Sequence, residues 1–243
     1  MQQAFGKWCI LVALALCALQ LFFVLRMVSM LVIDPQSTAF ERSEAWRILN
    51  LSDKPFAWKQ VWVPYEDISN HLKRAVIASE DNDFAYHDGV EWDAIERALQ
   101  SNAKAQEQAV KRSPSGKVRT PRVVGASTIT QQLVKNLFFA SERTYLRKGQ
   151  EFVLALVIEL VLSKQRILEI YLNSAEWGEG VFGAEAAAQR YFRKPAAQLS
   201  SYEAARLAVM LPGPKLYEKM PNSAYLNKRA QTISARMADA DLP

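Results

Sequence analysis

The chain has 243 residues, of which 50% are hydrophobic and 23% are charged, enough for one sizeable domain core and an appendage. Its formal net charge of +5 permits an anionic partner (nucleic acid, a membrane surface or a phosphorylated substrate) but is too small to select among them. Both cysteines, Cys9 and Cys17, lie in an apolar N-terminal segment, so the remaining sequence excludes a disulfide framework and a thiolate metal site. With only two histidines, a His-rich metal site is excluded as well.

The N-terminal segment is predicted to cross a membrane. From Trp8 to Leu25 the only strongly polar residue is Gln20, and a second apolar run follows from Met27 to Ile33. A helix rising about 1.5 Å per residue crosses a hydrocarbon layer of about 30 Å with roughly 20 residues. We therefore expect residues 1–33 to form a transmembrane anchor.

A cleaved signal peptide is the alternative interpretation of this segment. The Ala13–Ala15 stretch resembles a small-x-small cleavage site, but it would fall inside the apolar run. An uncleaved anchor is therefore favoured. Charge leaves its orientation open, because Lys7 on one side competes with Arg26, Arg42 and Arg47 on the other.

Residues 34–67 are interpreted as a membrane-proximal connector, followed by a domain at residues 68–243. The connector contains several prolines and tryptophans and shows no sustained hydrophobic period. Tryptophan is favoured at lipid interfaces, so we expect its aromatic side chains to pack on the domain or on the membrane surface.

The first part of the domain alternates helices with loops. Apolar residues recur at helical spacing over 68–79, so Glu80 stands where this helix gives way to a loop closed by Gly89. Residues 92–110 are typical of an amphipathic helix, with Ile95, Ala98 and Leu99 expected to face inward. The basic segment 111–122 is a loop by composition, either merely solvated or in contact with a phosphate or lipid headgroup.

A helix is predicted to begin near Thr128, because Thr128 and Gln131 have the spacing of a capping box. Residues 151–162 are almost wholly apolar apart from Glu159 and predict a buried central helix. Further helices are expected over 164–173, up to Phe192, and from a second capping box at Ser200 through residue 210. Period-2 alternation is scarce, so the fold class is mainly α.

Two acids and a cluster of cations are candidates for chemistry. Arg147 and Lys148 precede Glu151 by four and three residues, which places all three on one helix face. A solvated face with ion pairs is the structural explanation for such a cluster, and helix-end acids such as Glu80 are commonly caps. Paired carboxylates in an apolar cleft are also how proteins run glycosidic bond chemistry, and His87 is more simply explained as a loop anchor.

Four ordered segments of the chain carry a resemblance to a known family. They are EDNDFAYHDG at 80–89, GASTITQQLVKN at 125–136, RKGQE at 147–151 and ILEIYLN at 167–173. In order and spacing they resemble the signature motifs of the peptidoglycan glycosyltransferases, over roughly residues 68–214. No transpeptidase module follows, so the chain resembles the monofunctional biosynthetic form. The resemblance implies a lysozyme-like helical domain with an N-terminal transmembrane helix.

The resemblance also implies roles for individual residues. Glu80 would be the general base for the acceptor lipid II, and Glu151 would assist the departing undecaprenyl pyrophosphate or hold the geometry of the site. The residues that would bind substrate are Ser127, Gln132, Lys135, Asn136, Arg143 and Lys148. Those that would shape the cleft are Asp81, Phe84, His87, Gly125 and Thr128, with Glu169, Tyr171 and Asn173 behind them. Gln150 stands where some relatives carry another base.

The implied enzyme polymerises lipid II into glycan strands at the periplasmic side of the inner membrane. Its partners would be lipid II, the growing strand, the membrane and other cell wall synthesis or division proteins, with no nucleic acid. No cofactor is required on this view, although a divalent cation, Mg²⁺ or Mn²⁺, bridging pyrophosphate oxygens stays open. Two alternatives are a lysozyme-like hydrolase or lytic transglycosylase, which does not need the cations around Glu151, and a membrane-tethered scaffold, in which both acids are dispensable.

Overall fold

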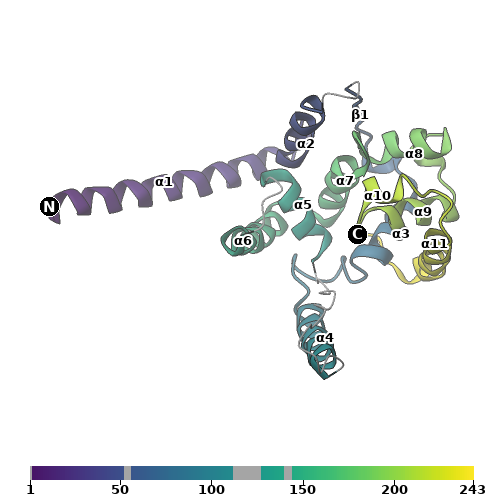
Figure 1. The fold of residues 1–243 in the computed structure, drawn as a ribbon. Helices are drawn as coiled ribbons and strands as arrows, with labels where there is room; N and C mark the ends of the chain where they lie inside the picture. The colour runs from purple at the N-terminus through teal and green to yellow at the C-terminus, as the bar shows by residue number, and fades with distance from the viewer. Residues whose placement is uncertain (1, 52–55, 112–126, 140–143) are drawn as a thin grey trace.

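The structure is a computed structural model that describes residues 2–51, 56–111, 127–139 and 144–243. Most of the described chain is helical, as the sequence predicts, and the helices form a body from which α1 and α4 project (Figure 1). The helices are α1 Gln2–Ser29, α2 Ala39–Leu49, α3 Asn70–Glu80, α4 Trp92–Lys111, α5 Ile129–Phe138, α6 Tyr145–Val161, α7 Lys164–Ser174, α8 Ala184–Phe192, α9 Ser201–Met210, α10 Pro214–Tyr217 and α11 Ala224–Arg236. Short 3₁₀ helices occupy Tyr65–Asp67, Ala196–Gln198 and Met237–Asp239.

Side-chain caps fix where several of these helices begin. The capping boxes predicted at Thr128 and Ser200 are both present, with Gln131 and Glu203 as their reciprocal partners. Each box satisfies two backbone donors that would otherwise lack a partner at the start of a helix. The start of α5, which carries several candidate site residues, is therefore fixed locally by its own sequence.

A small sheet covers one end of the body. Its order is β1-β3-β2, with β1 Lys59–Gln60 parallel to β3 Val181–Phe182 and β2 Glu176–Gly178 antiparallel to β3. Gly180 turns the chain between β2 and β3 with φ +66, and a Cβ there would meet the carbonyl oxygen of Ala57 at 2.1 Å. The connector thus pairs with the domain through backbone contacts that only glycine permits.

The core lies between α3, α5, α7 and α9, with α11 packed on α9 and α3. Its largest fully buried side chains include Trp177, Tyr171 and Phe84. The sequence analysis left open the path of the chain after Pro214. This part forms α10 and α11, and Arg74 of α3 donates to the carbonyl oxygen of Ala240 near the C-terminus.

Helix α1 is long and apolar enough to cross a membrane over Phe5–Ser29. Most of its apolar side chains are exposed, but Phe23, Met27 and Met30 near its end are buried. The Phe23 ring packs edge-on against Phe138 of α5, with 5.1 Å between ring centroids. The last turns of α1 therefore belong to the core of the body.

The connector contains a helix, α2, to which the sequence analysis assigned no element. Thr38 and Glu41 form a capping box at its start. Lys215 pairs with Glu44 of α2 and lies 3.3 Å from Glu176 of β2. Helix α2 is thus held by polar contacts with distant parts of the chain, which explains why no apolar period reveals it.

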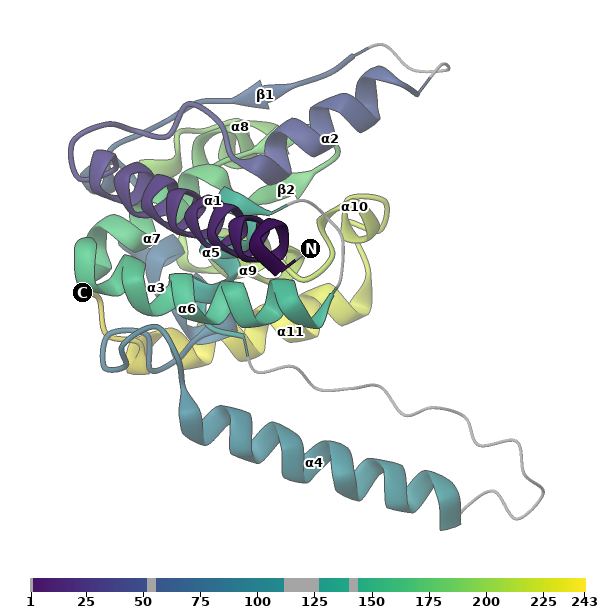
Figure 2. The same ribbon diagram turned by 90° about the vertical axis from the view of Figure 1, so that its left-hand side faces the viewer.

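Helix α4 has the predicted bounds to within one residue, but the prediction that its apolar face points inward is wrong. Leu99 is 65% exposed, and Ile95 and Ala98 are only partly buried. Both views show α4 projecting away from the body (Figures 1 and 2). Its contact at the base is Trp92, whose ring meets Phe152 of α6 edge-on at 5.4 Å.

Helix α6 was predicted to be a buried central helix, and this is only half correct. Leu154, Ala155 and Ile158 are buried, whereas Leu160 is 86% exposed and Val153 is 50% exposed. Helix α6 packs beside α1 (Figure 2). One side of α6 faces the core, and its other side presents apolar side chains outward.

Candidate active site

Glu80 is the last residue of α3, and its carboxylate is held by neutral side chains. Gln132 of α5 donates from Nε2 to Oε2 of Glu80 at 3.0 Å, and Ser79 donates to Oε1 at 3.3 Å. Tyr171 of α7 donates its hydroxyl to Oε1 of Gln132 at 3.1 Å, which fixes the orientation of the amide. Helices α3, α5 and α7 therefore all contribute to the placement of this carboxylate.

The surroundings of Glu80 favour its protonated form. Desolvation is the largest influence and raises the pKa of the Glu80 carboxyl, while hydrogen bonds from Gln132 and Ser79 act in the opposite direction. The neighbouring Asp81 raises this pKa further, and Arg229 lowers it. A carboxylate whose pKa is raised toward neutral pH is a better proton acceptor than an ordinary one.

Asp81 and His87 tie the loop after α3 to the start of α5. The buried Asp81 accepts a hydrogen bond from the backbone N–H of Ile129 at 2.9 Å and lies 2.8 Å from Nε2 of His87. Gly89 donates its N–H to Nδ1 of His87 at 3.1 Å, so the ring proton is on Nε2 and points to Asp81. These contacts give His87 the loop-anchoring position favoured from its sequence context.

Gly89 and Thr128 complete this connection. The Thr128 hydroxyl donates to the carbonyl oxygen of Gly89 at 2.6 Å. The fully buried Phe84 packs edge-on against His87, with 6.3 Å between ring centroids. Phe84, His87 and Thr128 were expected to shape the cleft. All three take part in the contact between the loop after α3 and the start of α5.

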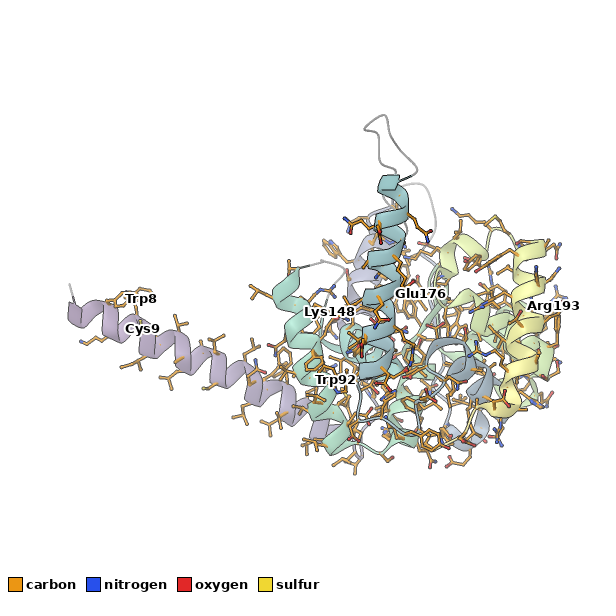
Figure 3. All side chains as sticks on the ribbon, turned by 90° about the horizontal axis from the view of Figure 1, so that it is seen from below. Trp8, Cys9, Trp92, Lys148, Glu176 and Arg193 are labelled. Carbon is orange, nitrogen blue, oxygen red and sulfur yellow. The ribbon has the colours of Figure 1, made fainter. Side chains whose placement is uncertain are left out.

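A second charged group lies at the start of α6. The buried Glu151 has one carboxylate oxygen 2.5 Å from Arg147 and the other 3.3 Å from Lys148. Lys148 also donates to the hydroxyl of Ser127 at 3.3 Å, and about half of its side chain is exposed. In Figure 3, Lys148 lies between the projecting α1, which carries Trp8 and Cys9, and the far side of the body, which carries Arg193.

The first turns of α5 connect the two groups. Ser127 lies one residue before the Thr128 cap of α5, and Gln132 lies in its first turn. Ser127 contacts the Lys148 group, and Gln132 contacts Glu80. Among the described residues no hydrogen bond or ion pair joins Glu80 directly to Glu151. The two carboxylates are thus held separately, within reach of one short stretch of chain.

The other predicted site residues have different outcomes. Lys135 is partly exposed one turn after Gln132, and Asn136 is buried on the same helix. Gly125 and Arg143 lie outside the described residues, as does nearly all of the basic segment 111–122. Their predicted roles stay predictions.

Three contacts near the site were missed by sequence reasoning. Thr130 donates to Glu159 at 2.5 Å, and Lys164 pairs with the same carboxylate at 2.8 Å. Gln150, next to Glu151, donates to Gln20 in the middle of α1 at 2.8 Å. Each contact involves a lone polar residue in an apolar run, and that isolation is the signal that could have indicated a buried polar partner.

The described residues contain no group of three or more His, Cys, Asp or Glu side chains that could hold a metal ion. Glu80 and Glu151 sit in separate groups, one bonded to neutral side chains and the other to cations. A divalent ion here would therefore need oxygens from a substrate to complete its coordination.

Comparisons with known proteins agree on one family. A family model described as transglycosylase matches residues 50–238, a range that includes every candidate site residue. A protein of Herminiimonas arsenicoxydans is 48% identical over 237 residues, covering 97% of this chain and 96% of its own length. Relatives from Burkholderia thailandensis and Bordetella pertussis are 50% and 52% identical, cover 93% and 86% of this chain, and are each covered over 82% of their own length. All three carry the name biosynthetic peptidoglycan transglycosylase.

Proposed function

Since the chain belongs to the transglycosylase family, we propose that this peptidoglycan transglycosylase of cell wall synthesis polymerises lipid II into glycan strands and releases undecaprenyl pyrophosphate. The observation that carries the proposal is that the carboxylates of Glu80 and Glu151, both beside α5, have different kinds of partner. One group is a carboxylate held by neutral donors, and the other is a carboxylate paired with two cations.

Glu80 is the general base in this reaction. It takes the proton from the 4-hydroxyl of the acceptor lipid II, and that oxygen attacks the anomeric carbon at the lipid-linked end of the growing strand. The bond from this carbon to the diphosphate oxygen breaks, the diphosphate leaves with the electron pair, and the configuration inverts. A raised pKa supports this role, because a base works best when its pKa lies near the operating pH.

The cations stabilise the departing diphosphate. Lys148 is held by Glu151 and Ser127 with half of its side chain exposed, so its ammonium group can reach a bound substrate. Lys135 and Arg143 would add further positive charge. Negative charge develops on the leaving group in the transition state, and a positioned donor at such a site contributes about 3 kcal/mol, or roughly a hundredfold in rate. A divalent ion, Mg²⁺ or Mn²⁺, would supply further positive charge there, with oxygens of the substrate completing its coordination.

The protein is anchored in the inner membrane by α1, with its body on the periplasmic side. The length and exposed apolar surface of α1 support the anchor. Helix α6 packs against α1 and also exposes apolar side chains, which supports the same anchoring. Both substrates carry polyprenyl chains in the bilayer, so anchoring confines enzyme and substrate to one surface and raises their effective concentration.

The test is to incubate the purified full-length protein with labelled lipid II in detergent and to look for polymer that lysozyme digests. We expect polymer from the unaltered protein and at least a hundredfold less from Glu80→Gln, because an amide cannot accept the proton. Glu66→Gln is the matched control, since Glu66 is exposed and its hydrogen bond is to Gln165, outside the Glu80 and Glu151 groups. Undiminished polymer from Glu80→Gln would remove the proposed base, and free disaccharide released from lipid II in place of polymer would indicate a hydrolase.

A further inference from the structure

A small hollow lies where α1 ends and the chain turns into α2. Its volume is about 210 Å³. It is lined by residues from the last turns of α1 and from the turn before α2: Arg26, Ser29, Met30, Asp34, Gln36 and Ser37. None of the candidate active-site residues lines it, so the hollow is distinct from the groups around Glu80 and Glu151.

Two guanidinium groups converge on Ser37, which lines this hollow. Arg26 donates from Nη2 to the carbonyl oxygen of Ser37 at 2.9 Å, and Arg42 donates from Nη1 to the same oxygen at 3.1 Å. Arg42 also reaches the Ser37 hydroxyl at 3.0 Å. Within the described chain neither guanidinium has a carboxylate within ion-pair distance, and the buried Nε of Arg26 has no hydrogen-bond partner. Two positive charges are thus held together without a counter-ion.

The acid that lines the hollow is paired with a different cation. Asp34 pairs with Arg166 at 2.7 Å, and Arg166 also pairs with Glu169 at 2.9 Å. The charge of Asp34 is therefore directed to α7 and does not compensate Arg26.

Glu41 is the other acid near these cations, and it is also engaged. Its carboxylate accepts hydrogen bonds from the N–H of Thr38 at 2.7 Å and from Gln60 at 2.9 Å. Burial raises the pKa of Glu41, although Arg42 acts against that rise. Glu41 serves as the cap of α2, so neither Asp34 nor Glu41 forms an ion pair with Arg26 or Arg42.

The position of Arg26 along α1 matches the edge of a bilayer. No charged residue separates Lys7 from Arg26, and these 19 steps correspond to about 29 Å of helix, close to the ~30 Å thickness of a hydrocarbon layer. Arg26 then lies at the level of the lipid phosphates. On the membrane side of Arg26, Leu21, Phe22 and Leu25 are 58%, 55% and 59% exposed, as side chains that contact acyl chains would be.

We propose that Arg26 and Arg42, with the polar side chains of the hollow, bind the phosphate headgroup of an anionic membrane phospholipid. Guanidinium groups present several donors in a planar fork that fits phosphate oxygens. An anionic headgroup is favoured over a zwitterionic one, because the acids near the hollow are engaged and leave no free partner for an ammonium group. The inference rests on the membrane anchor of the proposed function but not on its catalytic chemistry.

The test uses the full-length protein in detergent micelles, titrated with dioleoylphosphatidylglycerol or dioleoylphosphatidylcholine, with bound lipid counted by native mass spectrometry. We expect one site that prefers phosphatidylglycerol, with affinity lowered about tenfold in Arg26→Gln and in Arg42→Gln, as for loss of one charge-assisted contact. Arg42→Gln keeps the test valid if Arg26→Gln fails to insert, since Arg42 lies outside the span. Lys228→Gln, an exposed cation on α11, is the control and should bind as the unaltered protein does.

Three outcomes would overturn the headgroup site. They are equal binding of the two lipids, unchanged affinity in both arginine variants, and displacement of the lipid by soluble glycerol phosphate at equal concentration, which would indicate a free-phosphate site. Alkaline extraction of cell membranes tests the anchor separately. Release of the chain would remove the membrane span and the headgroup site together, whereas the polymerisation assay in detergent would still report on the catalytic proposal.

Discussion

At the scale of single residues, neutral donors and charged partners give the two glutamates different surroundings. Gln132 and Ser79 donate to Glu80 without adding charge, whereas Arg147 and Lys148 place two cations on Glu151. The proposed base must lose its proton before the reaction, and a carboxylate beside the proposed diphosphate leaving group must not repel it. The different partners suit these different tasks.

Gln132→Leu is expected to move the acid limb of the pH profile to higher pH. As the proposed general base, Glu80 would act only when ionised, so kcat/KM is expected to fall as the pH falls through its raised pKa. The hydrogen bond from Gln132 favours the charged form, so its loss raises this pKa further. The measurement is kcat/KM for lipid II polymerisation against pH, with Gln100→Leu on the exposed face of α4 as the control. An unmoved acid limb would show that Gln132 does not tune the base.

Lys148→Ala is expected to lower the rate of polymerisation about a hundredfold, the usual effect of removing one positioned group from a site of developing charge. It also leaves Arg147 as the remaining cation on Glu151. Steady-state kinetics should show the loss in kcat, since the charge develops in the transition state. Lys219→Ala, an exposed lysine after α10, should change neither parameter. A change confined to KM would assign Lys148 to substrate binding alone.

At the scale of elements, local sequence rules predicted helix starts well and helix environments poorly. The boxes at Thr128 and Ser200 were readable because all their atoms come from four consecutive residues. The box at Thr38 carries the same signal, but α2 buries Glu41 and Glu44 instead of an apolar stripe, so no period supported it. An apolar pattern also cannot say what covers it, which is why the inward face assigned to Leu99 was wrong.

The loop between α3 and α4 has one position where a side chain should not be tolerated. Gly89 has φ +82, and a Cβ there would lie 2.9 Å from both the Ala155 carbonyl oxygen and Glu159. Gly89→Ala should therefore lower the free energy of unfolding by about 1–3 kcal/mol for the backbone conformation alone. Thermal unfolding would register this as a fall in Tm of roughly 2–12 °C for a domain of this size.

Gly149 provides the matched control for that substitution. It lies within α6, and a Cβ there would meet nothing within 4 Å. Gly149→Ala should raise stability by about 0.5–1 kcal/mol, because alanine loses less backbone freedom in a helix. Similar destabilisation by both substitutions would mean that Gly89 carries no special conformational or steric constraint.

At the scale of the whole molecule, the site depends on contacts between segments far apart in the chain. The resemblance to a family identified Glu80, Gln132 and Glu151 as candidates, but the bond from Tyr171 to Gln132 spans 39 residues and that from Gln150 to Gln20 spans 130. Periodicity and capping describe only local relations, so neither contact could be predicted from them. The second contact joins the predicted anchor to the helix that carries Glu151.

The last turns of the membrane helix α1 should therefore unfold together with the catalytic body. Met27 is fully buried at the end of α1, whereas Leu25 on the same turn is 59% exposed. Met27→Ala should lower the free energy of unfolding by about 2–5 kcal/mol, as deletion of a buried core side chain does, and Leu25→Ala should change it little. Thermal unfolding of the full-length protein in detergent, followed by tryptophan fluorescence, measures both. Equal effects would mean that α1 is a passive tether, while the expected difference would show that its last turns form part of the core beneath α5.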